Sequence, residues 1–294
     1  MHPLVAKLVR AGVTVTDGAW GTQLQARGLA IGEFPDIWNL LHPERVGAVA
    51  ESYVEAGSQV ILTNTFGANR LRLAGHNLAE RIKEINRQGV EISVEAAKGR
   101  ALVFASVGPT GKLLITGETT EDELQSAFEE QTAALAEAGA DALVIETMAE
   151  MTEAVIATRA ARRTGLPVIA CMVFDAGKDR DRTAMGVTIP QAVAALTDAG
   201  ADVIGANCGQ GIAGFVPICA RLRAATDLPI WLKANAGMPE LVNGRAVYRT
   251  TPEAFASHVP ELVAGGANFV GGCCGTNPFF VRALLQKVRG SDAA

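Results

Sequence analysis

Four segments of the sequence repeat one pattern, in which a small-residue turn precedes a short apolar run. They read EAGSQVILTN (55–64), EAGADALVIE (137–146), DAGADVIGANC (198–208) and AGGANFVGGCC (264–274). The glycine suits the C-terminus of a helix, and the apolar run suits a buried parallel strand. Seven residues after the glycine, each run ends in a polar or metal-binding side chain: Asn64, Glu146, Asn207 and Cys273. The repeat predicts helix–strand units that carry their chemistry at strand ends.

Further apolar runs at 13–18, 101–109, 167–174 and 229–237 bring the predicted strands to eight. Helical stretches alternate with them, and Thr120 with Glu123 forms an expected capping box at the start of one helix. Eight such units without a linker predict an α/β protein with a single (β/α)8 barrel. We expect the barrel domain to cover residues 1–290, followed by a short tail at 291–294. An open doubly wound sheet is the alternative, but DGAWGTQL lacks the glycine spacing of a dinucleotide site.

Composition excludes several functional classes. The net charge is −5 and no basic run is interleaved with aromatics, so we expect no nucleic-acid partner. The N-terminus has no apolar signal segment, and no apolar run is long enough to span a bilayer, so we expect no membrane association. Five cysteines are too few for a disulfide scaffold in 294 residues, which favours a reducing, cytoplasmic location.

The predicted strand ends should meet at one rim, because active sites of such barrels lie at the C-terminal ends of the strands. The polar side chains expected there are Asp17, Asn64, Thr65, Glu146, Asn207, Cys208, Asn235, Cys273 and Cys274.

Three of the cysteines are expected to come together at this rim. Cys208 ends the sixth strand, while Cys273 and Cys274 end the eighth, and these two strands flank the seventh. Small apolar packing is one alternative, and a strained bridge between the two adjacent cysteines is another. Three cysteine ligands and one open position are typical of a catalytic zinc, which would hold an incoming thiol as a thiolate for attack on an electrophilic carbon. Cys171 and Cys219, by contrast, are expected in the core.

Six motifs, in this order, carry a family resemblance: TDGAWGTQL, ILTNTFGANR, SVGPTG, VIETM, GANCG and GGCCGTNP. From about Val13 to the final helix, the chain resembles the zinc-dependent homocysteine S-methyltransferases. That family includes betaine–homocysteine methyltransferases and the homocysteine-binding domain of cobalamin-dependent methionine synthase. The resemblance implies a (β/α)8 barrel, in agreement with the strand count. It also implies an enzyme that moves a methyl group to the thiol of homocysteine and so forms methionine.

The resemblance also implies roles for individual residues. Cys208, Cys273 and Cys274 match the family's zinc ligands. Asp17 and Glu146 match carboxylates that hold the homocysteine ammonium group, and backbone amides near Gly18, with Thr65, match the part that receives the carboxylate. Asn64 and Asn207 are also counted among the predicted substrate-binding residues. From residue type and position alone, Asn64 and Asn235 are expected mainly to satisfy loop backbone groups, and Asn207 to support the zinc thiolates.

The methyl donor is less constrained by the sequence. The family accepts methyl groups from betaine, from sulfonium compounds, or from a methylcorrinoid carried on another domain or protein. Trp38 in FPDIWNLLHPE could face an onium donor through a cation–π contact, or it could be a buried aromatic. No corrinoid-binding D-x-H-x-x-G segment is present, so a corrinoid would have to arrive on a separate protein. An oligomer is compatible with the sequence, and the charged loop 175–186 is either a solvated loop or a lid.

Two other classes remain as alternatives. In a Schiff-base lyase or aldolase, Lys233 in PIWLKANAG would be the reactive amine and the cysteines would be structural. In a non-catalytic zinc or partner-binding module, the metal site would be closed by four ligands. The same zinc barrel acting on another thiol or donor, in a demethylation pathway, is a third possibility.

Overall fold

A computed structural model gives the structure of residues 1–242 and 245–291. Eight parallel strands form one sheet in the order β1-β10-β7-β6-β5-β4-β3-β2, and a parallel bridge between Thr16 and Val60 joins its two edges. The strands are β1 Thr14–Val15, β2 Val60–Ile61, β3 Leu102–Val107, β4 Ala142–Met148, β5 Val168–Met172, β6 Val203–Gly211, β7 Ile230–Asn235 and β10 Ala267–Gly272. The predicted (β/α)8 barrel is therefore confirmed.

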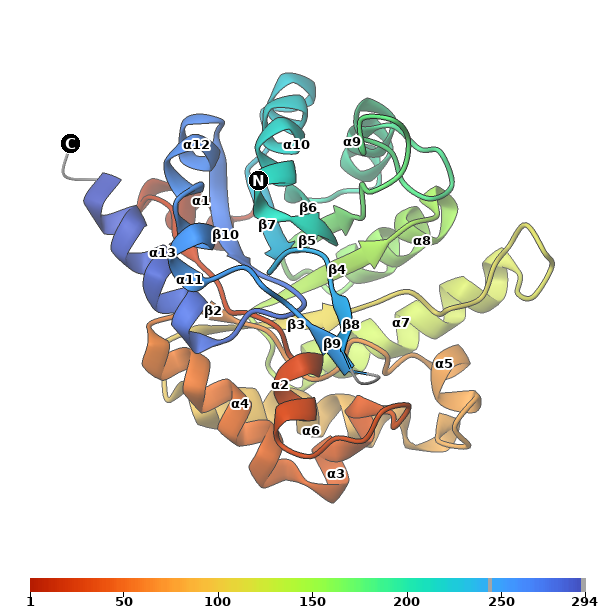
Figure 1. Cartoon of the computed structure of the whole chain (residues 1–294). Coiled ribbons are helices and arrows are strands. Elements are labelled where there is room, and N and C mark those ends of the chain that lie inside the picture. Colours follow the sequence, from red (N-terminus) through yellow and green to blue (C-terminus); the bar gives the residue numbers. More distant parts are fainter. Residues whose placement is uncertain (243–244, 292–294) are drawn as a thin grey trace.

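Helices form a ring around these strands (Figure 1). They are α1 Pro3–Arg10, α2 Gly21–Ala26, α3 Trp38–Leu41, α4 Pro43–Ala56, α5 Arg70–Ala74, α6 Ile82–Ala97, α7 Glu121–Glu137, α8 Met151–Arg162, α9 Ile189–Asp198, α10 Ile212–Ala225, α11 Pro252–Ala256, α12 Val259–Ala264 and α13 Pro278–Ser291, with 3-10 turns η1 Pro35–Ile37 and η2 Ala79–Arg81. The predicted capping box of Thr120 and Glu123 opens α7. Of the predicted tail, Ser291 ends α13 and the rest lies outside the described residues.

The sequence repeat has a structural cause. Each turn glycine (Gly57, Gly139, Gly200 and Gly266) is left-handed, with φ of +99°, +94°, +98° and +93°. Two residues later, a side-chain oxygen accepts a hydrogen bond from the backbone N–H at the start of a neighbouring strand. The four pairs are Gln59 with Val15, Asp141 with Val103, Asp202 with Val168 and Asn268 with Ile230, at 2.8–3.2 Å. These contacts fix strand register at the N-terminal end of the barrel and thereby position the opposite rim.

A plug of large side chains fills the barrel below that rim. The Trp231 ring lies between Phe104 and Phe269, with centroids 6.1 and 5.3 Å away. Cys171 belongs to this inner cluster, whereas Cys219 packs in the outer layer between strands and helices, and each is only 1% exposed. Both are core residues, as the sequence predicts. The packed interior forces any ligand to sit on top of the barrel.

One element departs from the sequence prediction. Between β7 and α11, the strands β8 Glu240–Val242 and β9 Arg245–Val247 pair antiparallel beside the barrel mouth (Figure 1). Among the described residues, no helix is long and apolar enough to cross a bilayer.

Candidate active site

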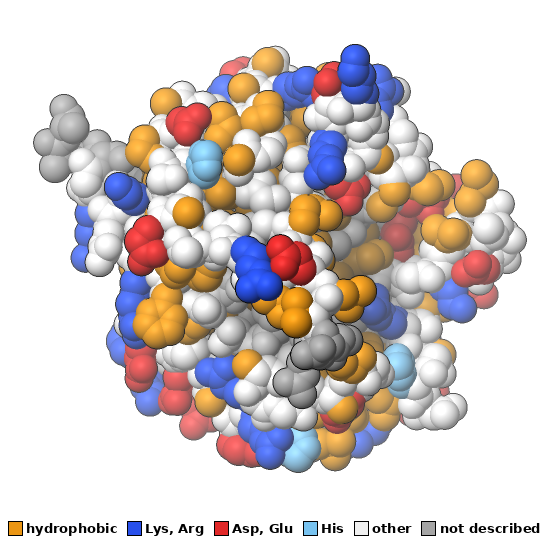
Figure 2. Space-filling model, viewed as in Figure 1, with side chains coloured by type: hydrophobic (Ala, Val, Ile, Leu, Met, Phe, Trp, Pro, Cys, Tyr) orange, Lys and Arg blue, Asp and Glu red, His pale blue; other side chains and the backbone are white. Residues whose placement is uncertain are grey.

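A cavity of about 270 Å³ opens at the C-terminal ends of the strands. Figure 2 shows this face of the molecule hollowed next to β8 and β9. One end of the cavity is built from strand ends and is called the thiol end here. It comprises Ser106, Glu146, Thr147, Cys208, Lys233, Cys273 and Cys274. The other end is built from the loops after β1 and β2 and is called the loop end. It comprises Trp20, Thr22, Phe34, Pro35, Asp36, Phe66, Gly67 and Arg72.

The three predicted metal-binding sulfurs do meet. The Sγ atoms of Cys208, Cys273 and Cys274 all lie within 4.8 Å of one another, and each side chain is partly exposed to the cavity. Cys208 adopts a left-handed conformation with φ of +61°, inside an irregular stretch of β6 between Asn207 and Gly211. Such irregularities re-aim side chains at barrel rims, and backbone strain is retained mainly at functional sites. The local backbone therefore turns Cys208 toward the pair on β10.

Backbone contacts hold the adjacent cysteine pair against β7. The Cys273 N–H donates to Ala234 O at 2.7 Å, and the Ala236 N–H donates to Cys274 O at 2.9 Å. The Thr276 hydroxyl donates to Cys273 O at 2.7 Å. With their main chains fixed in this way, both side chains are presented to the same point.

The thiols share their protons unequally. Cys273 and then Cys274 donate toward Cys208 and lower its pKa, whereas donation to Cys208 raises the pKa of Cys273 and that of Cys274 above their ordinary range. One thiolate therefore forms readily, while like-charge repulsion opposes the next two. A divalent cation would remove that repulsion, since a metal-bound thiol is deprotonated outright. The donor set consequently fits a thiophilic metal ion.

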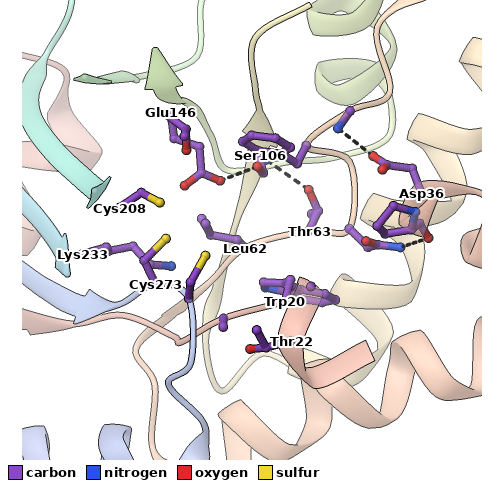
Figure 3. A pocket seen from close by; sticks show the side chains of 18 of the residues that line it. Trp20, Thr22, Asp36, Leu62, Thr63, Ser106, Glu146, Cys208, Lys233 and Cys273 are labelled. Atoms are coloured by element: carbon purple, nitrogen blue, oxygen red, sulfur yellow. Dashed lines mark hydrogen bonds between the residues drawn. The ribbon is translucent and has the colours of Figure 1, made fainter. Parts of the chain in front are cut away.

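Glu146 lies at the end of β4 beside this cluster (Figure 3). Its Oε1 accepts a short hydrogen bond from the Ser106 hydroxyl, and its Oε2 accepts one from Asn207 Nδ2 at 3.3 Å. Burial raises the pKa of Glu146, and the charge of Lys233 opposes that rise. A carboxylate so placed can receive a cationic group of a ligand while remaining attached to the barrel.

The Asn207 side chain hydrogen-bonds to residues of β4. Its Oδ1 accepts the Thr147 N–H at 2.7 Å, and its Nδ2 donates to Thr147 Oγ1 at 2.7 Å. These bonds hold Thr147 in a left-handed conformation with φ of +63°. The expectation that Asn207 supports the zinc thiolates stays a prediction, since its hydrogen bonds go to Thr147 and Glu146. The Asn235 side chain is among the groups that help to lower the pKa of Cys208, after the neighbouring thiols.

Asp17 is buried beneath the cavity and does not line it. Its Oδ1 forms an ion pair with Lys233 Nζ, and its Oδ2 accepts hydrogen bonds from Leu62 N–H at 2.7 Å and Trp20 Nε1 at 2.8 Å. Lys233 does line the cavity, although it is only 2% exposed. The sequence places both residues at strand ends but does not reveal that they are paired.

Other predicted residues fall into two groups. Gly18 and Asn64 line the cavity. Asn64 Nδ2 donates hydrogen bonds to Pro35 O and to Asn39 Oδ1, both at 2.9 Å, as a loop-stabilising residue would. Thr65 is fully buried outside the cavity lining, and its hydroxyl donates to Ser106 O at 2.7 Å.

Trp38 also lies outside the cavity lining. It is 1% exposed, and its Nε1 donates to Glu33 Oε1 at 2.7 Å. The buried-aromatic alternative therefore describes Trp38, and the expected contact with an onium donor is corrected. Loop 175–186 does not line the cavity either. Gln210 Nε2 donates to Arg180 O at 3.2 Å, and Asp181 pairs with Arg221, so this loop is anchored to the body of the barrel.

The aromatic side chains that do line the cavity were not predicted. Phe66 occupies the loop end because Gly108 lacks a side chain: a Cβ there would lie 2.5 Å from the ring. The Arg72 guanidinium lies over Phe66, 5.7 Å from the ring centroid. TNTFGANR contains the aromatic residue, but periodicity cannot indicate the direction of a loop side chain.

Comparisons with known proteins agree with this geometry. Residues 14–288 match the family model described as homocysteine S-methyltransferase. The chain is 32% identical to methionine synthase of Mycobacterium tuberculosis and 30% identical to that of Mycobacterium leprae. Each match covers 94% of this chain but 24% of the relative, so the chain spans about a quarter of the length of those relatives.

Solved structures give the same result. The metallated form of the homocysteine methyltransferase MmuM from Escherichia coli superposes with a TM-score of 0.80 at 25% identity, covering 98% of this chain and all of that one. Its oxidized form, at 24% identity with the same coverage, has a TM-score of 0.82 and supports the fold. Because the family model spans nearly the whole chain and both ends of the cavity, the chain belongs to the homocysteine S-methyltransferase family.

Proposed function

We propose that this protein transfers a methyl group to the thiol of homocysteine, giving methionine, with Zn²⁺ held by Cys208, Cys273 and Cys274. The observation that carries the proposal is the convergence of three sulfurs within 4.8 Å beside a buried carboxylate, in a chain of this family. Three cysteine ligands with room for a fourth ligand are typical of catalytic zinc. When bound, zinc would supply a Lewis acid that lowers the pKa of the acceptor thiol.

The protein's own residues orient the two substrates. Glu146 would receive the acceptor ammonium, since it is buried, anchored by Ser106 and open to the cavity. The loop end, with Phe34 and Phe66, would hold the methyl donor and exclude water. The acceptor thiol releases its proton to solvent, and the resulting thiolate sulfur attacks the methyl carbon in line. The bond from that carbon to the donor breaks, and its electron pair stays with the donor. Holding both partners in one cavity would add to the rate by fixing the reacting atoms in position.

The environment of Lys233 disfavours the Schiff-base alternative. Burial lowers the pKa of Lys233, but the charges of Asp17 and Glu146 outweigh burial and raise that pKa above its ordinary value. A nucleophilic lysine needs the opposite shift, because only the neutral amine attacks a carbonyl carbon. Metal-binding thiols must also stay reduced, which supports a reducing, cytoplasmic location as part of the proposal.

One experiment tests the proposed function and identifies the donor. Zinc-loaded protein is incubated with homocysteine and, in turn, betaine, S-methylmethionine and methylcobalamin, and methionine is measured. We expect methionine with at least one donor. A small onium donor would fit the loop end directly, whereas turnover with methylcobalamin alone would indicate that the methyl group comes from a corrinoid. Failure of all three donors with fully metallated protein would count against the proposal.

A further inference from the structure

The thiol end of the cavity contains its own ammonium group. Lys233 projects from β7 between the strands that carry Cys208 and the Cys273–Cys274 pair, and Figure 3 shows it at the same end of the cavity as Glu146. Its position is tightly set by the barrel: a Cβ on Gly271 would lie 3.3 Å from Lys233 Cγ and 1.9 Å from Thr16 Oγ1. The lysine stem therefore packs against bare backbone, and its ammonium group has little freedom.

Asp17 is already occupied by protein donors. Lys233, Leu62 and Trp20 together engage both of its carboxylate oxygens, and it is 0% exposed. A ligand ammonium could reach Asp17 only by displacing Lys233 from a buried ion pair. Breaking such a pair is costly, because it leaves a buried charge uncompensated. Asp17 is thus better suited to hold Lys233 than to hold a substrate.

The ionic side chains Asp17, Lys233 and Glu146 give the thiol end both a positive and a negative group. Asp17 and Lys233 cancel, so Glu146 carries the remaining negative charge. Glu146 Oε2 accepts one hydrogen bond of 3.3 Å from Asn207, which leaves it able to accept from a ligand. An ammonium group has three donors, and Asp17 is the one acceptor that hydrogen-bonds to Lys233 among the described residues. Two N–H groups of a cavity-lining cation are thereby left for a ligand anion.

We propose that Lys233 is a specificity-determining residue that receives the carboxylate of the acceptor, while Glu146 receives its ammonium group. The site would thus select the zwitterion of an α-amino acid thiol. The inference rests on the proposed function and assigns one of its contacts to a new residue. Thr65 is the side chain first expected near the carboxylate. Its hydroxyl donates a hydrogen bond to Ser106 O at 2.7 Å and forms a second one with Thr63 Oγ1 at 2.6 Å.

The test uses three acceptors that differ by one charged group: homocysteine, 3-aminopropanethiol, which lacks the carboxylate, and 4-mercaptobutanoate, which lacks the ammonium group. Binding to the zinc-loaded protein is measured by calorimetry, and KM and kcat are measured with the best donor. For Lys233→Met, we expect affinity for homocysteine and 4-mercaptobutanoate to fall about 10- to 100-fold, as for a lost charge-assisted hydrogen bond. Affinity for 3-aminopropanethiol should change less than about threefold, because this acceptor has no carboxylate for Lys233 to bind. A threefold change corresponds to a free energy smaller than that of a charge-assisted hydrogen bond.

Matched variants separate this role from folding. Lys233→Met leaves Asp17 buried without its partner, so the double variant Asp17→Asn/Lys233→Met removes both charges and should show the same acceptor pattern. Lys233→Arg keeps the charge and should restore part of the affinity for homocysteine. Glu146→Gln is the reciprocal control. It should weaken the binding of homocysteine and of 3-aminopropanethiol but leave the binding of 4-mercaptobutanoate unchanged.

Three results would overturn the inference: equal losses for all three acceptors in the double variant, unchanged homocysteine affinity, or a wild-type preference for 4-mercaptobutanoate over homocysteine. Failure of the proposed function looks different. In that case wild-type protein makes no methionine with any donor, whereas failure of this inference alone leaves wild-type turnover intact.

Discussion

The two ends of the cavity are built in different ways. At the thiol end, functional side chains come from the ends of β3, β4, β6, β7 and β10, and two of the rim residues, Thr147 and Cys208, are left-handed. At the loop end, the lining comes from the connections after β1 and β2 and includes the aromatic side chains Trp20, Phe34 and Phe66. Strands that share one hydrogen-bonded sheet can hold reacting groups accurately, whereas loops can change without disturbing the barrel. We therefore expect the thiol end to set the chemistry and the loop end to set the donor.

Two buried aspartates show the same contrast. Asp17, below the thiol end, is neutralised by Lys233. Asp36, at the loop end, accepts one hydrogen bond from the Gly67 N–H at 2.9 Å and has no ion pair among the described residues. The thiol end thus compensates its buried charge with a second charge, while the loop end relies on a backbone amide.

The largest effect is expected from Cys208→Ala. Removing one of three thiolate ligands should abolish stoichiometric zinc retention and lower turnover by about 10³-fold or more, since the metal is held by so few groups. Zinc is measured by elemental analysis and turnover by methionine formation. Cys219→Ala is the matched control: Cys219 packs against the Leu262 region in the outer layer and should leave zinc content unchanged. Full zinc occupancy with full activity in Cys208→Ala would refute the ligand assignment.

The second prediction concerns Asp36 and pH. Burial raises the pKa of Asp36 to about 7 from an ordinary value of 3.8, with the Gly67 hydrogen bond and Arg72 opposing the rise. The unfolded chain releases this proton near pH 4 and the folded chain near pH 7. The contribution of Asp36 to stability is therefore complete below pH 4 and is lost as the pH rises to about 7, by at most about 4 kcal/mol.

Denaturant unfolding between pH 4 and pH 8 measures this slope. Asp36→Asn cannot titrate, so its free energy of unfolding should fall less over the same range than that of the wild type. Identical pH profiles for the two proteins would show that Asp36 is not the group responsible.

At the loop end, Phe66→Leu should raise KM for the methyl donor about three- to tenfold, through lost aromatic contact, while KM for homocysteine changes little. Steady-state kinetics with each substrate varied in turn would check this split. A rise in the homocysteine KM of the same size would mean that the two ends of the cavity do not divide the substrates as proposed.

The smallest effect is expected from Trp38→Phe. Trp38 lies outside the cavity lining and its indole bonds to Glu33, so KM for the donor should stay within about twofold of wild type, with a loss of about 1 kcal/mol in stability. Donor kinetics and thermal unfolding measure the two quantities. A donor KM as high as that of Phe66→Leu would place Trp38 in contact with the donor after all.

Much of the fold could be predicted because its signals are local. The four turn glycines, the apolar runs after them and the capping box of Thr120 each depend on neighbouring residues, and the structure contains all of them. The β8–β9 hairpin was missed, although an Asn-Gly pair at 243–244 is a known hairpin signal. The role of the polar residue two positions after each turn glycine was not predicted either. Its side chain accepts a hydrogen bond from a backbone N–H at the start of another strand, which is distant in the sequence.

Spacing along the chain was sufficient to determine a barrel of eight units and the meeting of Cys208 with Cys273 and Cys274, since strand order in such a barrel follows chain order. Tertiary structure alone decided which side chains face the cavity and which charges pair. Lys233 pairs with Asp17, and Trp20 rather than Trp38 lines the site. The reason is physical: contacts across strands and loops depend on register, bulges and loop direction, and none of these is a function of sequence distance.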